Sequence, residues 1–210
     1  MNDVRPTTVL IAALGGEGGG VLADWVVNAA RAEDLWVQAT SIPGVAQRTG
    51  ATTYYIEMMP KSGDGRRPVF ALTASPGNID LMVASELLEA GRAVENGYIT
   101  PDRTTLIAST HRFYAMAEKT ATTDGRYDAD RIEAAAAEMA KQAILRDLKA
   151  KAEDAGSIIN AVLLGAMAGS GALPVPADTL RQAIVDGGIA VEFEPERVRG
   201  RLRPGADGRR

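Results

Sequence analysis

Residues 7–32 read TTVLIAAL, then GGEGGG, then VLADWVVNAARA. The first part, Thr7–Leu14, is a short apolar run and predicts a buried strand. In the third part, Val21–Ala32, the apolar residues recur at the i, i+3, i+4, i+7 spacing of a helix face, at Leu22, Trp25, Val26 and Ala29. Leu35–Ala39 then forms a brief β-prone run. A strand, glycine loop, helix and strand in this order predict a parallel sheet with a right-handed crossover.

Further elements are predicted along the rest of the chain from apolar runs and turn residues. The predicted strands are Thr52–Met59, Val69–Leu72 as its hairpin partner, Ile79–Ala84 and Thr105–Ala108. The predicted helices are Ser85–Val94, a long alanine-rich one at Arg131–Ala155, Ile158–Met167 and Ala177–Asp186. This pattern predicts an α/β fold, a Rossmann-like and mostly parallel sheet flanked by helices, in a single domain over residues 1–196.

Residues 197–210 differ in composition from the rest of the chain. They contain six arginines, three glycines and a proline, and almost no apolar side chains that could enter a core. We therefore expect a flexible arginine-rich tail. It either steers an acidic partner or is simply solvated, and the sequence favours the second interpretation.

The counts of cysteine and histidine exclude several kinds of chemical site. The 210 residues include no cysteine and one histidine, His111. The chain therefore offers no disulfide, no thiolate ligand for zinc or an iron–sulfur cluster, no cysteine nucleophile and no multi-histidine metal site. We predict no metal ligands and no catalytic residues in it.

Charge and hydropathy suggest where the chain acts. The formal charge of −4 argues against general nucleic-acid binding. No run of 18 apolar residues could span a membrane, and the polar residues 1–6 do not resemble a signal peptide. We expect a cytoplasmic protein.

The glycine loop departs from the dinucleotide-binding fingerprint G-x-G-x-x-G. The aligned positions are Ala13, Gly15 and Gly18, so the first glycine is missing, and Glu17 would repel a phosphate. The second strand ends in Ala-Thr-Ser, without a carboxylate for a ribose. Two interpretations stay open: the loop binds a nucleotide, or its glycines allow a tight turn and close packing against another chain. The sequence favours the second.

Four polar residues are candidates for a role in a site. Gln47 and Arg48 lie in a Gly/Pro-bounded loop beyond a predicted strand, where Arg48 could clamp a carboxylate or phosphate or instead fix the loop or a subunit contact. His111 could carry a proton, although such a histidine more often bonds a backbone carbonyl. Glu86 opens a predicted helix, and we interpret it as a cap.

The stretch Ser41–Thr52, SIPGVAQRTGAT, resembles the gamma-type domain of the 2-oxoacid:ferredoxin oxidoreductases, and within that group most closely the beta subunit of indolepyruvate oxidoreductase. Further matching stretches are Asp80–Leu87 with Gly91-Arg92, Thr100–Asp102, Leu106–Arg112 and Gly165–Pro174. The resemblance extends from about Val9 to Val191. Ala13 and Glu17 depart from it, since they replace the first Gly and the Gln of its usual Gly-x-Gly-Gly-Gln-Gly pattern.

The resemblance implies a subunit that is not catalytic alone. The partner, a catalytic alpha subunit, would carry thiamine diphosphate (TPP) and Fe–S clusters, oxidise a 2-oxoacid such as indolepyruvate or another arylpyruvate, and pass electrons to ferredoxin. No cofactor is expected on this chain alone, with coenzyme A (CoA) possible at the shared interface. The expected active-site or interface residues are Gly15, Gly16, Gly18, Gly19, Gln47, Arg48 and Gly50. The alternative is a free-standing nucleotide- or flavin-binding module with a Rossmann-like fold.

Overall fold

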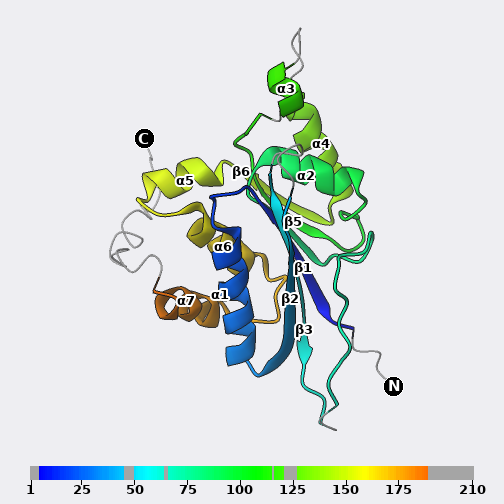
Figure 1. Ribbon diagram of the computed structural model, residues 1–210, viewed down its shortest axis with the longest axis vertical. Helices are drawn as coiled ribbons and strands as arrows, with labels where there is room; N and C mark the ends of the chain where they lie inside the picture. The colour runs from blue at the N-terminus through cyan, green and yellow to red at the C-terminus, as the bar shows by residue number, and fades with distance from the viewer. Residues whose placement is uncertain (1–4, 45–49, 64–65, 115, 121–126, 189–210) are drawn as a thin grey trace, which may run out of the picture.

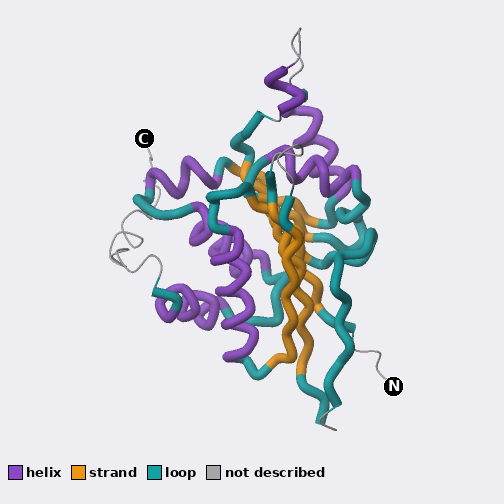
Figure 2. The backbone as a smooth tube through the Cα atoms, viewed as in Figure 1, coloured by secondary structure: helices purple, strands orange, loops and turns teal. Residues whose placement is uncertain are grey.

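Six strands form one central sheet with helices on both faces (Figures 1 and 2). The computed structural model describes residues 5–44, 50–63, 66–114, 116–120 and 127–188. The strands are β1 Thr7–Ala13, β2 Leu35–Ile42, β3 Thr52–Pro60, β4 Leu81–Ala84, β5 Thr105–Ser109 and β6 Gln142–Arg146. The helices are α1 Gly19–Ala32, α2 Leu87–Glu95, α3 Met116–Thr120, α4 Ala129–Met139, α5 Leu148–Asp154, α6 Ile159–Ser170 and α7 Ala177–Asp186.

The strand order is β2-β3-β1-β4-β5-β6. Strands β1, β4, β5 and β6 are parallel neighbours, while β3 is antiparallel to both β1 and β2. The predicted α/β fold, with a mostly parallel sheet between helices, is confirmed. The first strand–helix–strand unit also forms, and β2 runs in the same direction as β1. However, β3 is inserted between these two strands, so they do not pair with each other.

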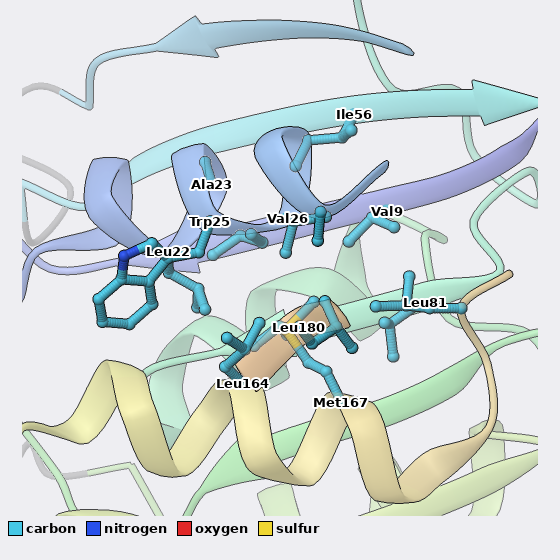
Figure 3. Packing of buried hydrophobic residues seen from close by; sticks show 14 of the residues in the cluster. Val9, Leu22, Ala23, Trp25, Val26, Ile56, Leu81, Leu164, Met167 and Leu180 are labelled. Atoms are coloured by element: carbon cyan, nitrogen blue, oxygen red, sulfur yellow. The ribbon is translucent and has the colours of Figure 1, made fainter. Parts of the chain in front are cut away.

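The core lies on both faces of β1, whose side chains alternate between them. Val9 and Ile11 face one apolar cluster, and Leu10 and Ala12 face the other. Helices α1, α6 and α7 cover the first face, and α2 and α4 cover the second (Figure 1). Figure 3 shows side chains from three helices meeting in the first cluster, among them Leu22 and Val26 of α1, Leu164 and Met167 of α6, and Leu180 of α7.

The predicted long helix Arg131–Ala155 is wrong. The structure divides this stretch into α4, strand β6 and α5. Residues of β6 pair in parallel with β5, from Thr105 opposite Gln142 to Ser109 opposite Arg146. The Asp147 carboxylate then caps α5 by accepting the amide of Ala150 at 2.8 Å. The alanine-rich composition favours helix, but pairing with an open sheet edge outweighs that preference.

The predicted hairpin strand Val69–Leu72 is also wrong. Strand β3 is already paired on both sides, by β1 and β2, so no edge is left for a hairpin partner. The segment crosses over β2 and β3 instead. The carbonyls of Ala71 and Leu72 accept from Gln38 and Thr40 of β2, and the amide of Ala71 donates to Glu57 of β3.

The other predicted elements agree with the structure to within a few residues, whereas helix α3 was not predicted. Helix α7 has the predicted bounds, and α6 continues past Met167 to Ser170, where Gly171 ends it in the left-handed region at φ 67°. Gln47, Arg48 and the predicted tail at 197–210 lie outside the described residues. Within the described ranges, no helix combines the length and apolarity needed to cross a membrane.

Candidate functional site

The carboxyl ends of three parallel strands meet at one edge of the sheet. The glycine loop follows β1, Ser85 and Glu86 follow β4, and His111 follows β5. Open α/β sheets bind ligands beyond this edge of their strands. Gly50, which follows the Gln-Arg pair in sequence, lies at the same edge, because it precedes β3, which is antiparallel to β1.

Two of the predicted site glycines are required by packing inside this chain. A Cβ on Gly19 would lie 2.5 Å from the Cβ of Ala13 and 2.8 Å from Cε2 of Tyr54. Gly18 precedes α1 with φ 71°, and a Cβ there would lie 2.4 Å from Nδ2 of Asn160. The sequence favoured packing of this loop against another chain. At these two glycines, the structure shows packing within the chain.

The other predicted glycines have free space where a Cβ would lie. Gly16 has φ 89° and Gly50 has φ 74°, and a Cβ on either would meet no atom within 4 Å. A Cβ on Gly15 would lie 3.6 Å from the carbonyl oxygen of Gly50. The structure therefore brings Gly15 of the glycine loop close to Gly50, at the end of the Gln-Arg loop. It does not describe Gln47 or Arg48, so their roles stay predictions.

Glu17 faces the strand ends in the structure. Its Oε1 lies 3.3 Å from Nε2 of His111, and its Oε2 accepts the hydroxyl of Ser85. Burial acts to raise the pKa of Glu17, but the hydrogen bonds from His111 and Ser85 outweigh it and hold the pKa below its usual 4.5. From the sequence, Glu17 was a charge that would repel a phosphate and a departure from the family pattern. Its pairing with His111 was not predicted, because the two residues are 94 positions apart in the chain.

His111 bridges the glycine loop and the end of β5. Its Nδ1 lies 2.7 Å from Oγ of Ser109, and the ring of Phe113 meets the imidazole edge-on at 5.5 Å. The expectation of an imidazole bonded to a backbone carbonyl is therefore wrong, since both ring nitrogens have side-chain partners. The order Ser109–His111–Glu17 resembles a hydrolase triad, but Ser109 is fully buried and its oxygen accepts two backbone amides. Such a hydroxyl cannot attack a substrate.

Glu86 caps α2, as the sequence predicted. Its carboxylate accepts the amides of Leu88 at 3.0 Å and Glu89 at 3.1 Å, and also faces the amide of Phe113 at 3.4 Å. The residue is fully buried, and this burial raises the pKa of its carboxyl group. Glu86 thus ties the loop after β5 to the start of α2, which holds the backbone beside His111 in place.

The chemistry available at this edge is hydrogen bonding. In the part of the chain that the structure describes, no three His, Asp or Glu side chains gather closely enough to hold a metal ion. Gly18 provides no side-chain cap for α1, and the first turn of α1 carries no acidic residue. The backbone amides at the start of α1 could therefore bind a polar group of a ligand or of another chain.

The sequence matches the model of one protein family. The profile described as "Pyruvate ferredoxin/flavodoxin oxidoreductase" matches residues 8–187. No curated protein matches the sequence.

Three solved structures have a similar fold. The pyruvate oxidoreductase subunit PORC of Thermotoga maritima is 16% identical, with a TM-score of 0.56 over 92% of this chain and 89% of that one. The keto/oxoacid ferredoxin oxidoreductase gamma subunit of Geobacter sulfurreducens is 14% identical, with a TM-score of 0.51 over 86% and 85%. The 2-oxoglutarate:ferredoxin oxidoreductase of Magnetococcus marinus, solved with 2-oxoglutarate, coenzyme A and succinyl-CoA bound, is 15% identical, with a TM-score of 0.57. The match covers 90% of this chain but 28% of that longer one.

Proposed function

Since the chain belongs to the pyruvate ferredoxin/flavodoxin oxidoreductase family, we propose that it is the non-cluster subunit of a thiamine-diphosphate-dependent 2-oxoacid:ferredoxin oxidoreductase. Its partner is the alpha subunit that carries TPP and the Fe–S clusters. The observation that supports the proposal is the closeness of Gly15 in the glycine loop to Gly50 at the carboxyl edge of the sheet, where a Cβ on Gly15 would lie 3.6 Å from the Gly50 carbonyl oxygen. Gly50 belongs to the stretch that resembles the family, and at this edge the chain can complete a partner's cleft.

The residues of this chain do not fit the redox cofactors of the family. Iron–sulfur clusters are held by cysteine thiolates, and the sequence has none. We propose that the partner carries both the clusters and TPP. In this chain we assign the cleft-forming role to Gly15, Gly16, Gly18, Gly19, Gln47, Arg48 and Gly50, with any CoA contact shared between the subunits.

The proposed substrate is an arylpyruvate, with indolepyruvate as the first candidate. The stretch Ser41–Thr52 supports this choice through its resemblance to the indolepyruvate oxidoreductase beta subunit. The complex would pass the electrons released by 2-oxoacid oxidation to ferredoxin.

Coexpression with the cluster-bearing subunit encoded by the same genome tests the proposal. A tag on this chain should recover a brown complex that reduces ferredoxin with an arylpyruvate and more slowly with pyruvate. The chain purified alone should be colourless and should bind neither NAD nor TPP in calorimetry. A flavin spectrum or tight nucleotide binding by the chain alone would instead support a free-standing nucleotide- or flavin-binding module.

A further inference from the structure

The hydroxyl group of Ser109 has all of its hydrogen-bonding capacity in use. Its Oγ accepts the amides of Leu148 at 3.0 Å and Lys149 at 3.3 Å, the first two residues of α5. A hydroxyl has two lone pairs and one proton, so only the proton remains. The remaining neighbour is Nδ1 of His111 at 2.7 Å. Ser109 therefore donates to Nδ1, and Nδ1 carries no proton.

The state of the imidazole follows from this bond. With Nδ1 as acceptor, the neutral ring carries its proton on Nε2 and donates it to Glu17 over 3.3 Å. The other carboxylate oxygen accepts from Ser85, whose Oγ in turn accepts the amide of Leu14 at 3.2 Å. The hydrogen bonds thus connect the end of β1, the glycine loop, β5 and the start of α5, and no two donors face each other.

We propose that His111 is a proton-sensitive latch: Ser109 accepts both first amides of α5 when the imidazole is neutral, and it can accept only one of them when the ring is protonated. A proton taken up from solvent binds Nδ1, where it meets the hydroxyl proton of Ser109. The Ser109 hydroxyl then has to rotate, so that its own proton no longer points at Nδ1 and its oxygen accepts from Nδ1–H. Three N–H donors then compete for two lone pairs, so one amide of α5 loses its partner.

The opposite side of the ring responds in the opposite sense. Protonation turns the Nε2–H bond to Glu17 into an ion pair, which strengthens it. Acid therefore tightens the hold on the glycine loop while it loosens α5. A neutral ring thus favours the hydrogen bonds to α5 through Ser109, and a protonated ring favours the bond to the glycine loop through Glu17.

Other charged groups lie on the elements around the ring, and each has a different partner. Glu86 accepts backbone amides, Arg112 pairs with Glu118, Arg146 bonds the Leu145 carbonyl, Asp147 caps α5, and Lys149 lies over Phe113. Among the described residues, Glu17 is the charged group within hydrogen-bonding distance of the imidazole. The response to a proton therefore runs through Glu17 and Ser109.

The latch would act on the same edge as the proposed subunit contact. Lys149 of α5 places its Nζ 4.9 Å from the ring centre of Phe113, which is 40% exposed beside His111. Loss of an amide hydrogen bond at Leu148 or Lys149 would loosen the backbone that carries this pair and so alter the surface offered to a partner. That consequence rests on the proposed function, whereas the latch itself is a property of the chain alone.

The first test determines which nitrogen of the neutral imidazole carries the proton. The protein has one histidine, so long-range ¹H–¹⁵N correlation spectra of the full chain with labelled histidine need no further assignment. We expect the Nε2–H tautomer. An Nδ1–H tautomer would overturn the proposal, because Ser109 could not then be the donor. No substitution and no partner subunit is needed, so the result is independent of the proposed function.

The second test follows hydrogen exchange of the Leu148 and Lys149 amides at a series of pH values from about 8 to about 5, where imidazole side chains in general change charge, after correction for intrinsic rates. Protection of at least one amide should fall by about tenfold on protonation. In His111→Asn, Oδ1 can still accept from Ser109 but does not titrate, so the fall should disappear. The amides of Asp130 and Arg131, capped by Asp128 on α4, serve as controls. The same fall in the parent chain and in His111→Asn would refute the latch.

Discussion

The side-chain amide of Asn160 donates to the carbonyl of Gly18 over 3.0 Å and joins α6 to the residue that precedes α1, across 142 positions of sequence. Asn160 is buried, and a Cβ on Gly18 would lie 2.4 Å from its Nδ2. This contact ties the glycine loop to α6. It also explains why a glycine is needed at position 18 independently of any ligand.

Replacing these two residues separately and together should show that they are coupled. Asn160→Ala should lower the free energy of unfolding by about 1 kcal/mol through loss of one buried hydrogen bond. Gly18→Ala should cost more, about 1–3 kcal/mol, because it adds a clash to an unfavourable positive φ. In the double variant the clash partner is absent, so the total cost should be less than the sum. Chemical denaturation of all four proteins measures this, and strict additivity would contradict the contact.

The neighbouring glycines of α1 offer a matched pair. Gly19 faces Ala13 with no room for a methyl group, so Gly19→Ala should destabilise by about 1–3 kcal/mol. Gly20 is one residue further on in the same helix, and its nearest contact for a Cβ is the Tyr54 hydroxyl at 3.5 Å. Gly20→Ala should be neutral or should stabilise by up to about 1 kcal/mol, because alanine favours helix. Thermal melts that rank the two variants in the reverse order would refute the described packing.

Asp80 should make the stability of the fold depend on acid pH. Burial acts to raise the pKa of Asp80, but hydrogen bonds from Arg103 and Thr8 outweigh it and hold the pKa below its usual 3.8. A lowered pKa in the folded state means that the contribution is present above pH 3.8 and is lost as the pH falls through the folded value. Asp80→Asn should therefore cost about 1–3 kcal/mol at neutral pH and progressively less in acid.

A control for Asp80 comes from an exposed ion pair. Asp178 pairs with Arg181 on α7, and its side chain is 90% exposed. Asp178→Asn should change the free energy of unfolding by roughly 0.5 kcal/mol or less at any pH. Urea titrations of both variants at a series of pH values test the difference. A gap between Asp80→Asn and the parent that stays constant into acid would contradict the predicted titration.

The parts of the fold that could be predicted from sequence are those with strong local signals. The apolar run of β1, the glycine loop and the periodic face of α1 carry their structure within about 25 neighbouring residues. Strand β6 does not, because an alanine-rich stretch favours helix and becomes a strand only by pairing with β5. The position of β3 between β1 and β2 is likewise a matter of long-range pairing. No local pattern specifies which strands become neighbours.

The candidate site shows the same division. Glu86 was predicted as a cap because its carboxylate immediately precedes the helix that it caps. Glu17 and His111 were each noticed in the sequence, but their bond joins residues on different strand ends. One signal could have suggested it: both follow predicted parallel strands, and the carboxyl ends of such strands lie at one edge. Ser85 holds the Glu17 carboxylate and Ser109 holds the His111 ring, so that the two side chains face each other. These two contacts are visible only in the structure.

Arg48 provides the most direct test of the proposed subunit role, and the reason comes from the sequence. It follows Gln47 in a polar Gly/Pro-bounded loop whose far end, Gly50, lies close to Gly15 of the glycine loop. Loss of a buried charged contact at an interface costs about 2–5 kcal/mol, so Arg48→Ala should slow 2-oxoacid oxidation by the assembled complex at least roughly tenfold. The isolated chain should keep its melting temperature. Arg48→Lys should restore activity only in part, because a point charge does not replace a planar two-pronged donor. An alanine variant that assembles and turns over at the parent rate would remove Arg48 from the site.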